Sequence, residues 1–259
     1  MPTQADKADA FAALHQPGNP LVIYNIWDAG SAKTVEAAGA PALATGSNPV
    51  ATAMGYPDGE MIPLETVLTN VQRIVACISV PLSVDFEGGY ALDAASITAN
   101  TRCLIDAGAI GVNFEDQIVG GTGLHSIATQ TARVGAVVAA GAAAGVPLFV
   151  NARTDVFLKA PADQHAAHLP EAIERAQAYA KAGASGFFAP GLTDPALIAA
   201  LIATTTLPVN LMMSPSAPPA ATLAALGAAR LSHGPFPWRA QMAALTAGYF
   251  AATAHQGKS

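Results

Sequence analysis

The feature that most constrains the fold is a short Ala/Gly motif that recurs between helical and strand-like stretches. It stands at residues 37–40 (AAGA), 106–109 (DAGA) and 181–184 (KAGA), and residues 226–229 (LGAA) follow the same plan. Glycine closes a helix in the left-handed conformation, so each copy is typical of a helix that ends and leads into a strand. A chain with several such junctions alternates helices with strands.

Eight β-rich runs fit this alternation. Strands that alternate with helical segments form βαβ units and a parallel sheet. Eight units in 259 residues match the roughly 250 residues of a typical (β/α)₈ barrel. We therefore predict an α/β fold, a (β/α)₈ TIM barrel that spans residues 1–259 as a single domain. The predicted strands are residues 21–25, 42–46, 81–87, 110–115, 148–153, 186–189, 209–213 and 230–233.

Composition excludes other classes of protein. Hydrophobic residues make up 52% of the chain and charged residues 12%, yet prolines interrupt the longest uncharged stretch, residues 195–229. A membrane span needs about 20 apolar residues in one helical run, so we expect no membrane partner. The polar N-terminus lacks the order of a signal peptide, and we expect a cytoplasmic protein. The net charge is −6 and the Lys and Arg residues are scattered, so we expect no nucleic-acid partner.

A doubly wound sheet with a bound nucleotide is the competing architecture. It would place G-x-G-x-x-G after the first strand, but residues 25–30 read NIWDAG. The Gly-rich residues 120–123 lack the Gly-Lys-Ser/Thr that completes a phosphate-binding loop, so we interpret them as a mobile loop.

Acidic residues follow two neighbouring predicted strands. Asp85 and Glu87 are two apart, which points them to the same side of a strand, and Glu115 ends the next strand. In such a barrel the C-terminal strand ends meet at one mouth. Carboxylates gathered there repel one another unless they share a cation, and oxygen ligands suit Mg²⁺, or alternatively Mn²⁺. We predict a metal site of these three acids; ordinary ion pairs at the barrel rim are the alternative.

Polar side chains on the same strand ends are candidates for binding a substrate. Arg153 offers a planar guanidinium that can grip a carboxylate or a phosphonate. Asn113, Asn151 and Asn210 lie in the fourth, fifth and seventh predicted strands and complete this set.

Other candidates have equally simple structural explanations. Asp58 could support the metal site or act as a general base, although its Pro-Asp-Gly context encodes a turn. His125 could transfer protons, or it is an exposed loop histidine. Thr45, Gly46 and Ser47 could offer backbone N–H groups to an anion, or they form the turn after the second strand.

These strand ends resemble the isocitrate lyase/phosphoenolpyruvate mutase superfamily from about residue 25 to residue 237. The motifs after the fourth and fifth strands are fairly specific together, whereas each alone is weak. The motifs that carry the resemblance are residues 25–32 (NIWDAGSA), 45–47 (TGS), 55–58 (GYPD), 84–90 (VDFEGGY), 111–117 (GVNFEDQ), 151–155 (NARTD) and 188–192 (FAPGL).

The resemblance implies a Mg²⁺ enzyme that breaks or rearranges a C–C or C–P bond next to a carbonyl. Asp85, Glu87 and Glu115 would then hold the metal, directly or through water. Asp58 would support that site, Gly46 and Ser47 would bind the substrate carboxylate through N–H groups, and Arg153 would steady developing negative charge. His125, Tyr24 or a metal-bound water would donate the proton.

Two departures narrow the activity. The isocitrate and methylisocitrate lyases carry Lys-Lys/Arg-Cys-Gly-His after the fourth strand, but residues 118–125 read IVGGTGLH, without cysteine. The mutases have an asparagine in this loop, which is also absent. Glu87 stands where an aspartate is more usual.

The main hypothesis is a Mg²⁺-dependent lyase that cleaves a C–C bond in a small 2-oxo or 2-hydroxy dicarboxylate through an enolate-like intermediate. The loop at residues 118–126 would close over the substrate. The alternatives are a phosphonomutase or phosphonopyruvate hydrolase, a non-catalytic oxo-acid binder and, further off, an aldolase. The helix near residues 238–253 is apolar, and members of the superfamily often exchange it between subunits, so we expect a homodimer or homotetramer.

Overall fold

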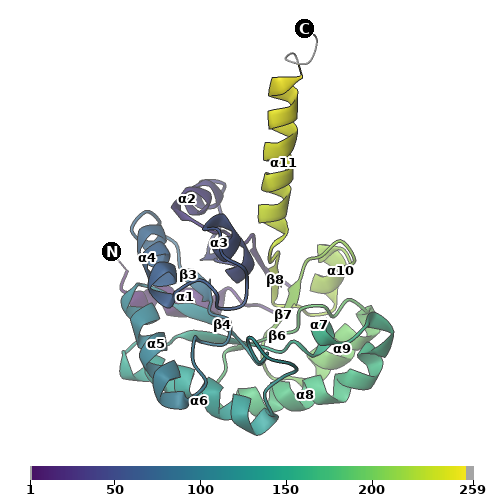
Figure 1. Ribbon diagram of the computed structural model, residues 1–259. Helices are drawn as coiled ribbons and strands as arrows, with labels where there is room; N and C mark the ends of the chain where they lie inside the picture. The colour runs from purple at the N-terminus through teal and green to yellow at the C-terminus, as the bar shows by residue number, and fades with distance from the viewer. Residues whose placement is uncertain (1, 255–259) are drawn as a thin grey trace.

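Eight parallel strands form a barrel in the computed structural model, which describes residues 2–254 (Figure 1). The spatial order is β1-β8-β7-β6-β5-β4-β3-β2, so each strand lies beside its neighbour in sequence. This confirms the predicted (β/α)₈ barrel. The strands are β1 Leu21–Ile23, β2 Leu43–Ala44, β3 Leu82–Asp85, β4 Gly111–Glu115, β5 Phe149–Arg153, β6 Gly186–Phe188, β7 Val209–Met212 and β8 Arg230–Ser232.

The barrel closes just beyond the ends of β1 and β2. Ile26 and Thr45 form an isolated parallel bridge there. The Ile26 N–H donates to the Ala44 carbonyl at 2.9 Å, and the Gly46 N–H donates to the Ile26 carbonyl at 3.2 Å. The closure leaves no free edge, which matters because an open edge of unpaired N–H and C=O groups invites aggregation.

Helices surround the barrel, and side chains at their N-termini stabilise several of them. Asp28 accepts the Ser31 N–H at the start of α2, and Asp194 accepts two N–H groups at the start of α9. Such caps satisfy the free N–H groups of a first helical turn. The surrounding helices are α2 Ala29–Ala37, α3 Ser47–Ala53, α4 Leu64–Val75, α5 Ala94–Asp106, α6 Ile127–Ala143, α7 Val156–Lys159, the 3₁₀ turn Ala162–Gln164, α8 His165–Lys181, α9 Pro195–Thr204 and α10 Ala220–Ala225.

The recurring Ala/Gly motif has the conformation that the sequence predicts. Gly39, Gly108, Gly183 and Gly227 all have φ between 94° and 103°. At Gly108 an added Cβ would also lie 2.8 Å from Cγ1 of Val75, so this helix end needs glycine for space as well as for conformation.

Helix α1, Gln4–Ala13, covers the N-terminal end of the barrel. Phe11 is fully buried, and its ring lies edge-on to Phe149 at the start of β5, with ring centroids 5.3 Å apart. His15 stacks on the same Phe149 ring at 4.0 Å. With this end closed, ligands enter from the C-terminal ends of the strands.

Helix α11, Phe236–Thr253, stands away from the barrel (Figure 1). Trp238 in its first turn meets Trp27 with ring centroids 5.2 Å apart. Leu245, Tyr249 and Phe250 farther along are each about two-thirds exposed, at 67%, 66% and 65%. Within residues 2–254, no helix is both long enough and apolar enough to cross a membrane.

Candidate active site

A pocket of about 190 Å³ opens at the C-terminal ends of the strands. Six of the predicted site residues line it together: Gly46, Ser47, Asp58, Asp85, Asn113 and Arg153. Glu87 and Glu115 line an adjoining hollow that shares Ser47, Asp58 and Arg153 with the first. The fold thus brings the predicted acids and the predicted arginine to one mouth, as expected for a barrel enzyme.

Asp85 is the last residue of β3, and its backbone and one carboxylate oxygen are fixed. Its N–H donates to Thr45 Oγ1 at 3.0 Å, and its Oδ2 accepts the Ser47 N–H at 3.0 Å. Its Oδ1 is buried without a hydrogen-bond partner among the described residues. Asp85 therefore lines the pocket with one buried carboxylate oxygen that no described group satisfies.

Glu87 is positioned by a strained turn instead of by strand alternation. β3 ends at Asp85, and Glu87 has φ 50°. Its Oε2 accepts the N–H of Glu60, and Glu60 Oε1 accepts the N–H of Tyr90. Glu60 and Tyr90 also have positive φ, 58° and 55°. Three non-glycine residues in this region of backbone space cost stability, and such strain concentrates at functional sites.

The acids perturb one another. Burial, together with Asp85 and Asp58, raises the pKa of Glu87 to about 8. Burial and then Asp85 raise the pKa of Asp58. Burial also raises the pKa of Glu115, against the opposing effect of Arg153. These carboxylates therefore lie close enough to favour a shared cation.

Arg153 is held on two sides by carboxylates. Its Nη1 lies 2.9 Å from Glu115 Oε2, while Nε and Nη2 lie 2.6 and 2.9 Å from the two oxygens of Asp155. Burial disfavours the charge of Arg153, but Glu115 and Asp155 keep its pKa well above the usual value. The guanidinium is thus fully charged and fixed at the pocket wall.

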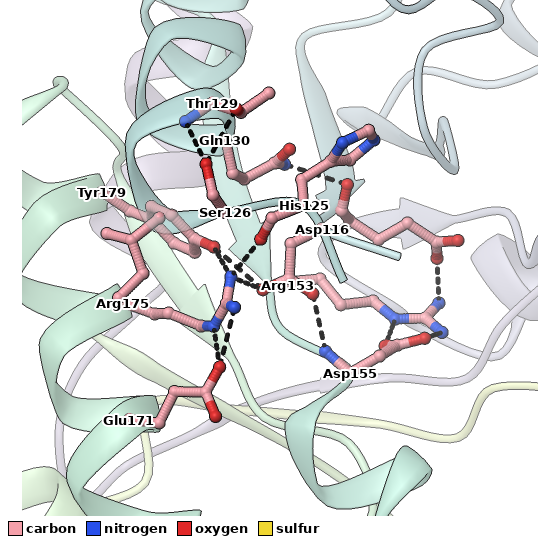
Figure 2. A network of polar contacts seen from close by, with 12 residues as sticks. Asp116, His125, Ser126, Thr129, Gln130, Arg153, Asp155, Glu171, Arg175 and Tyr179 are labelled. Carbon is pink, nitrogen blue, oxygen red and sulfur yellow. Dashed lines mark hydrogen bonds and ion pairs between the residues drawn. The ribbon is translucent and has the colours of Figure 1, made fainter. Parts of the chain in front are cut away.

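Asp116 organises a buried network that the sequence did not reveal (Figure 2). Its Oδ1 accepts the Asp155 N–H at 2.9 Å, and its Oδ2 accepts from Arg175 Nη1 at 3.1 Å and from the Tyr179 hydroxyl at 2.8 Å. Arg175 also donates to the carbonyl of His125, whose N–H donates to the carbonyl of Asp116. The network joins α8 to the ends of β4 and β5 and to the end of the loop after β4.

Some predicted residues lie away from the pocket. His125 lines a neighbouring hollow with Glu60 and Arg133. Tyr24 is 43% exposed and packs near the ring of His233, with centroids 5.2 Å apart. Neither His125 nor Tyr24 lines the main pocket.

Other predicted residues shape the pocket from below. Asn151 donates to Asn113 Oδ1 at 2.9 Å, and Asn210 donates to Ser232 Oγ at 3.0 Å. The N–H of Gly46 is already donated to Ile26, and that of Ser47 to Asp85. The expected anion-binding amides are therefore engaged by protein acceptors in this structure.

The acids fit a magnesium ion held partly through water. Among residues 2–254, no three Asp, Glu, His or Cys side chains are arranged to chelate a metal directly. The reason is visible: Arg153 binds Glu115, and the Glu60 N–H binds Glu87. The free oxygen of Asp85 remains, and Mg²⁺ usually takes one or two carboxylates and keeps several waters.

The fold and the pocket together define a (β/α)₈ barrel enzyme with an acidic site at its strand ends. Residues 11–252 match the phosphoenolpyruvate phosphomutase (PEP mutase) family. The chain therefore belongs to this family, an enzyme family of the isocitrate lyase and PEP mutase type.

Three similar proteins represent its relatives. 2-Methylisocitrate lyase of Escherichia coli K12 is 33% identical over 71% of this chain and 66% of its own length. Oxaloacetate decarboxylase of Rhodopseudomonas palustris TIE-1 is 29% identical over 74% and 66%. The chain thus spans about two thirds of these two relatives. The crystal structure of a putative phosphonomutase from Burkholderia cenocepacia J2315 is 43% identical, covers 98% of this chain and 100% of its own, and has a TM-score of 0.93.

Proposed function

We propose that this chain is a Mg²⁺-dependent lyase that cleaves a C–C bond in a small 2-oxo or 2-hydroxy dicarboxylate. The observation that carries the proposal is the pairing, within one pocket, of the free Asp85 oxygen with the fixed guanidinium of Arg153. Asp85 suits a cation and Arg153 suits an anion. A carboxylate substrate that chelates a metal ion satisfies both residues.

The pocket volume favours a small substrate. The volume of the pocket is about 190 Å³. That space suits a four-carbon acid with polar groups at both ends. Met212, Leu158 and Phe188 supply the apolar part of the wall, which limits water around the reacting carbon.

The residues of this chain would divide the work as follows. Asp85 would hold the metal directly, and Glu87 and Glu115 would hold it through water. A bound Mg²⁺ supplies Lewis-acid polarisation of a substrate oxygen. Arg153 binds the substrate carboxylate and stabilises negative charge that develops as the bond breaks.

Asp58 is the residue that we assign to moving a proton. It lines the main pocket beside Asp85, whereas His125 and Tyr24 do not line it. A carboxylate within reach of the reacting carbon can accept a proton and return it.

The loop after β4 argues against the 2-methylisocitrate lyase reaction. Residues 118–125 contain no cysteine, and the loop folds on itself through a bridge between Gln117 and Leu124. A positioned acid is worth roughly 10²–10⁴-fold in rate, so a lyase that depends on that cysteine would lose most of its rate.

Cleavage of a C–P bond is the second candidate. The structure with 43% identity is described as a putative phosphonomutase, and its chain is matched over its whole length. Arg153 can grip a phosphonate as well as a carboxylate.

Turnover distinguishes these functions. Purified chain with Mg²⁺ is incubated separately with oxaloacetate, 2-methylisocitrate and phosphonopyruvate, and products are followed by ¹H and ³¹P NMR, with EDTA and Asp85→Asn as controls. We expect Mg²⁺-dependent loss of oxaloacetate or a close relative. Turnover of phosphonopyruvate alone would establish the second candidate. Binding without turnover of any acid would make the protein an oxo-acid binder.

The assembly and the compartment complete the proposal. The exposed apolar side chains of α11 support a homodimer or homotetramer in which this helix packs on another copy. We propose a cytoplasmic location, and neither a membrane nor a nucleic acid as a partner.

A further inference from the structure

Arg230 is a buried cation without a carboxylate partner. It is the first residue of β8, and its side chain is fully buried inside the barrel. Neither Nη1 nor Nη2 has a hydrogen-bond partner within residues 2–254, and its guanidinium carbon lies 5.9 Å from the centre of the Phe11 ring. Buried arginines are almost always paired, so this one calls for a physical reason.

The group stays charged at neutral pH. Burial lowers the pKa of Arg230 to about 10, which is still far above 7. His15, also at the closed end of the barrel, is neutral there, because burial and the charge of Arg230 lower its pKa to about 3. The closed end of the barrel therefore carries the positive charge of Arg230, whose Nη1 and Nη2 have no hydrogen-bond partner among the described residues.

Hydrogen bonds connect this charge to the floor of the pocket. Arg230 Nε donates to Ser232 Oγ at 3.0 Å, and the Ser232 hydroxyl lies 3.1 Å from Asn210 Oδ1. Ser232 lines the main pocket together with Asp85 and Arg153. Arg230 is thus one side chain below the surface that a substrate would touch.

Asp85 faces the same interior from the other side of the barrel. The attraction of Asp85 acts on Arg230, and the buried Oδ1 of Asp85 has no hydrogen-bond partner among the described residues. Opposite charges that share a low-dielectric interior interact over a longer range than they would in water.

We propose that Arg230 is a positioning residue that supplies positive potential from beneath the pocket, where it favours a dianionic substrate and offsets the repulsion among the acids. The inference rests on the proposed function, since it assumes a dianion that binds beside a metal. A purely structural role explains the arrangement poorly, because an unpaired buried cation destabilises a fold.

The proposal predicts effects of opposite sign on two ligands. Arg230→Met keeps the length of the side chain and removes its charge. We expect the Kd of oxalate at saturating Mg²⁺ to rise about tenfold, because one favourable unit charge that acts from beneath the pocket, and not in contact with the ligand, is lost. We expect Mg²⁺ alone to bind more tightly, because a repelling charge has gone.

Isothermal titration calorimetry with oxalate and with MgCl₂ measures both constants. Arg230→Lys retains the charge and should stay close to the unchanged chain, and His15→Phe, which alters a neighbour without removing the charge, is the matched control. An unchanged oxalate Kd, or a rise in both constants, would overturn the proposal. If Arg230→Met does not fold by circular dichroism, Arg230→Gln replaces it, and failure of both neutral variants beside a folded Arg230→Lys would make the role structural.

A different result would contradict the proposed function without contradicting the role of Arg230. If the unchanged chain binds Mg²⁺ but no oxalate, the dicarboxylate assignment is lost. The tighter Mg²⁺ binding of Arg230→Met still tests the charge of Arg230 in that case, and unchanged or weaker Mg²⁺ binding there overturns the inference.

Discussion

Arg175→Met tests the buried network at the ends of β4 and β5. Arg175 reaches Asp116, which is fully buried, and Glu171, whose side chain is 42% exposed, at 3.1 and 2.7 Å. Removal of one partner from a buried ion pair costs about 3–5 kcal/mol of unfolding free energy. Asp116 keeps the Tyr179 hydroxyl and the Asp155 N–H as donors, so we expect the lower end, about 3 kcal/mol.

Thermal unfolding followed by circular dichroism measures the effect. For a chain of this size about 1 kcal/mol lowers Tm by about 2–4 °C, so Arg175→Met should lower it by about 6–12 °C. Tyr179→Phe removes one hydrogen bond to a buried carboxylate and should cost about 1.5 kcal/mol. Glu171→Gln is the matched control, because it breaks the exposed pair on the same arginine and should cost less than about 0.5 kcal/mol.

Two results would refute the reasoning. One is an Arg175→Met variant whose Tm lies within about 2 °C of the unchanged chain, equivalent to less than about 1 kcal/mol. The other is a Glu171→Gln variant that costs as much as Arg175→Met, since burial would then not determine the energy of these ion pairs.

Three further predictions concern stability and assembly. The unfolded chain protonates His15 near pH 6.5 while the folded chain does so only near 3, so this group alone lowers stability by about 2 kcal/mol as pH drops from 7 to 5. The raised pKa of Glu87 acts in the opposite direction over the same range, so the measurement is the difference in urea midpoint between the unchanged chain and His15→Phe, which should shrink by this amount at pH 5. Removal of α11 after Pro235 should leave a folded monomer by light scattering, and an unchanged chain that is itself a monomer would contradict this. Gly108→Ala should lower the free energy of unfolding by more than about 1 kcal/mol, because φ at Gly108 is 103° and Val75 is close. Gly135→Ala, in open space within α6, should raise it by about 0.8 kcal/mol, and urea unfolding measures both changes.

The barrel was predictable because its signals are local. The helix-to-strand junctions at residues 37–40, 106–109, 181–184 and 226–229 each carry a glycine, which specifies their conformation without reference to distant parts of the chain. The predicted strands are confirmed, with ends that differ by up to two residues. Those ends depend on pairing with neighbours, which a single strand does not encode.

The alternation of side chains along a strand predicted the site correctly only for residues that lie within the observed strands. It placed Asp85, Asn113 and Arg153 at one pocket. It gave the wrong reason for Glu87, whose position comes from a left-handed turn that ends the alternation at Asp85. A glutamate in a sequence does not by itself indicate that its backbone adopts a positive φ.

Long-range partners account for what the sequence did not reveal. Asp116 is adjacent to Glu115 and therefore points the other way, to Arg175 and Tyr179 on a helix about sixty residues later. Arg230 lies in a predicted strand, and the sequence indicated no role in the site for it. Its two-residue spacing from Ser232 places both inside the barrel, and that spacing was the available signal.

The loop after β4 is closed at its base by contacts of its own backbone and is tied to the barrel at His125. Ile118 N–H donates to the Gly123 carbonyl, Gln117 pairs with Leu124, and the backbone of His125 is tied to Asp116 and Arg175. Because these contacts are made by backbone atoms of the loop, the ends of the loop are placed largely independently of the side chains between them, so sequence changes inside the loop can alter what covers the strand ends while its attachment to Asp116 and Arg175 remains.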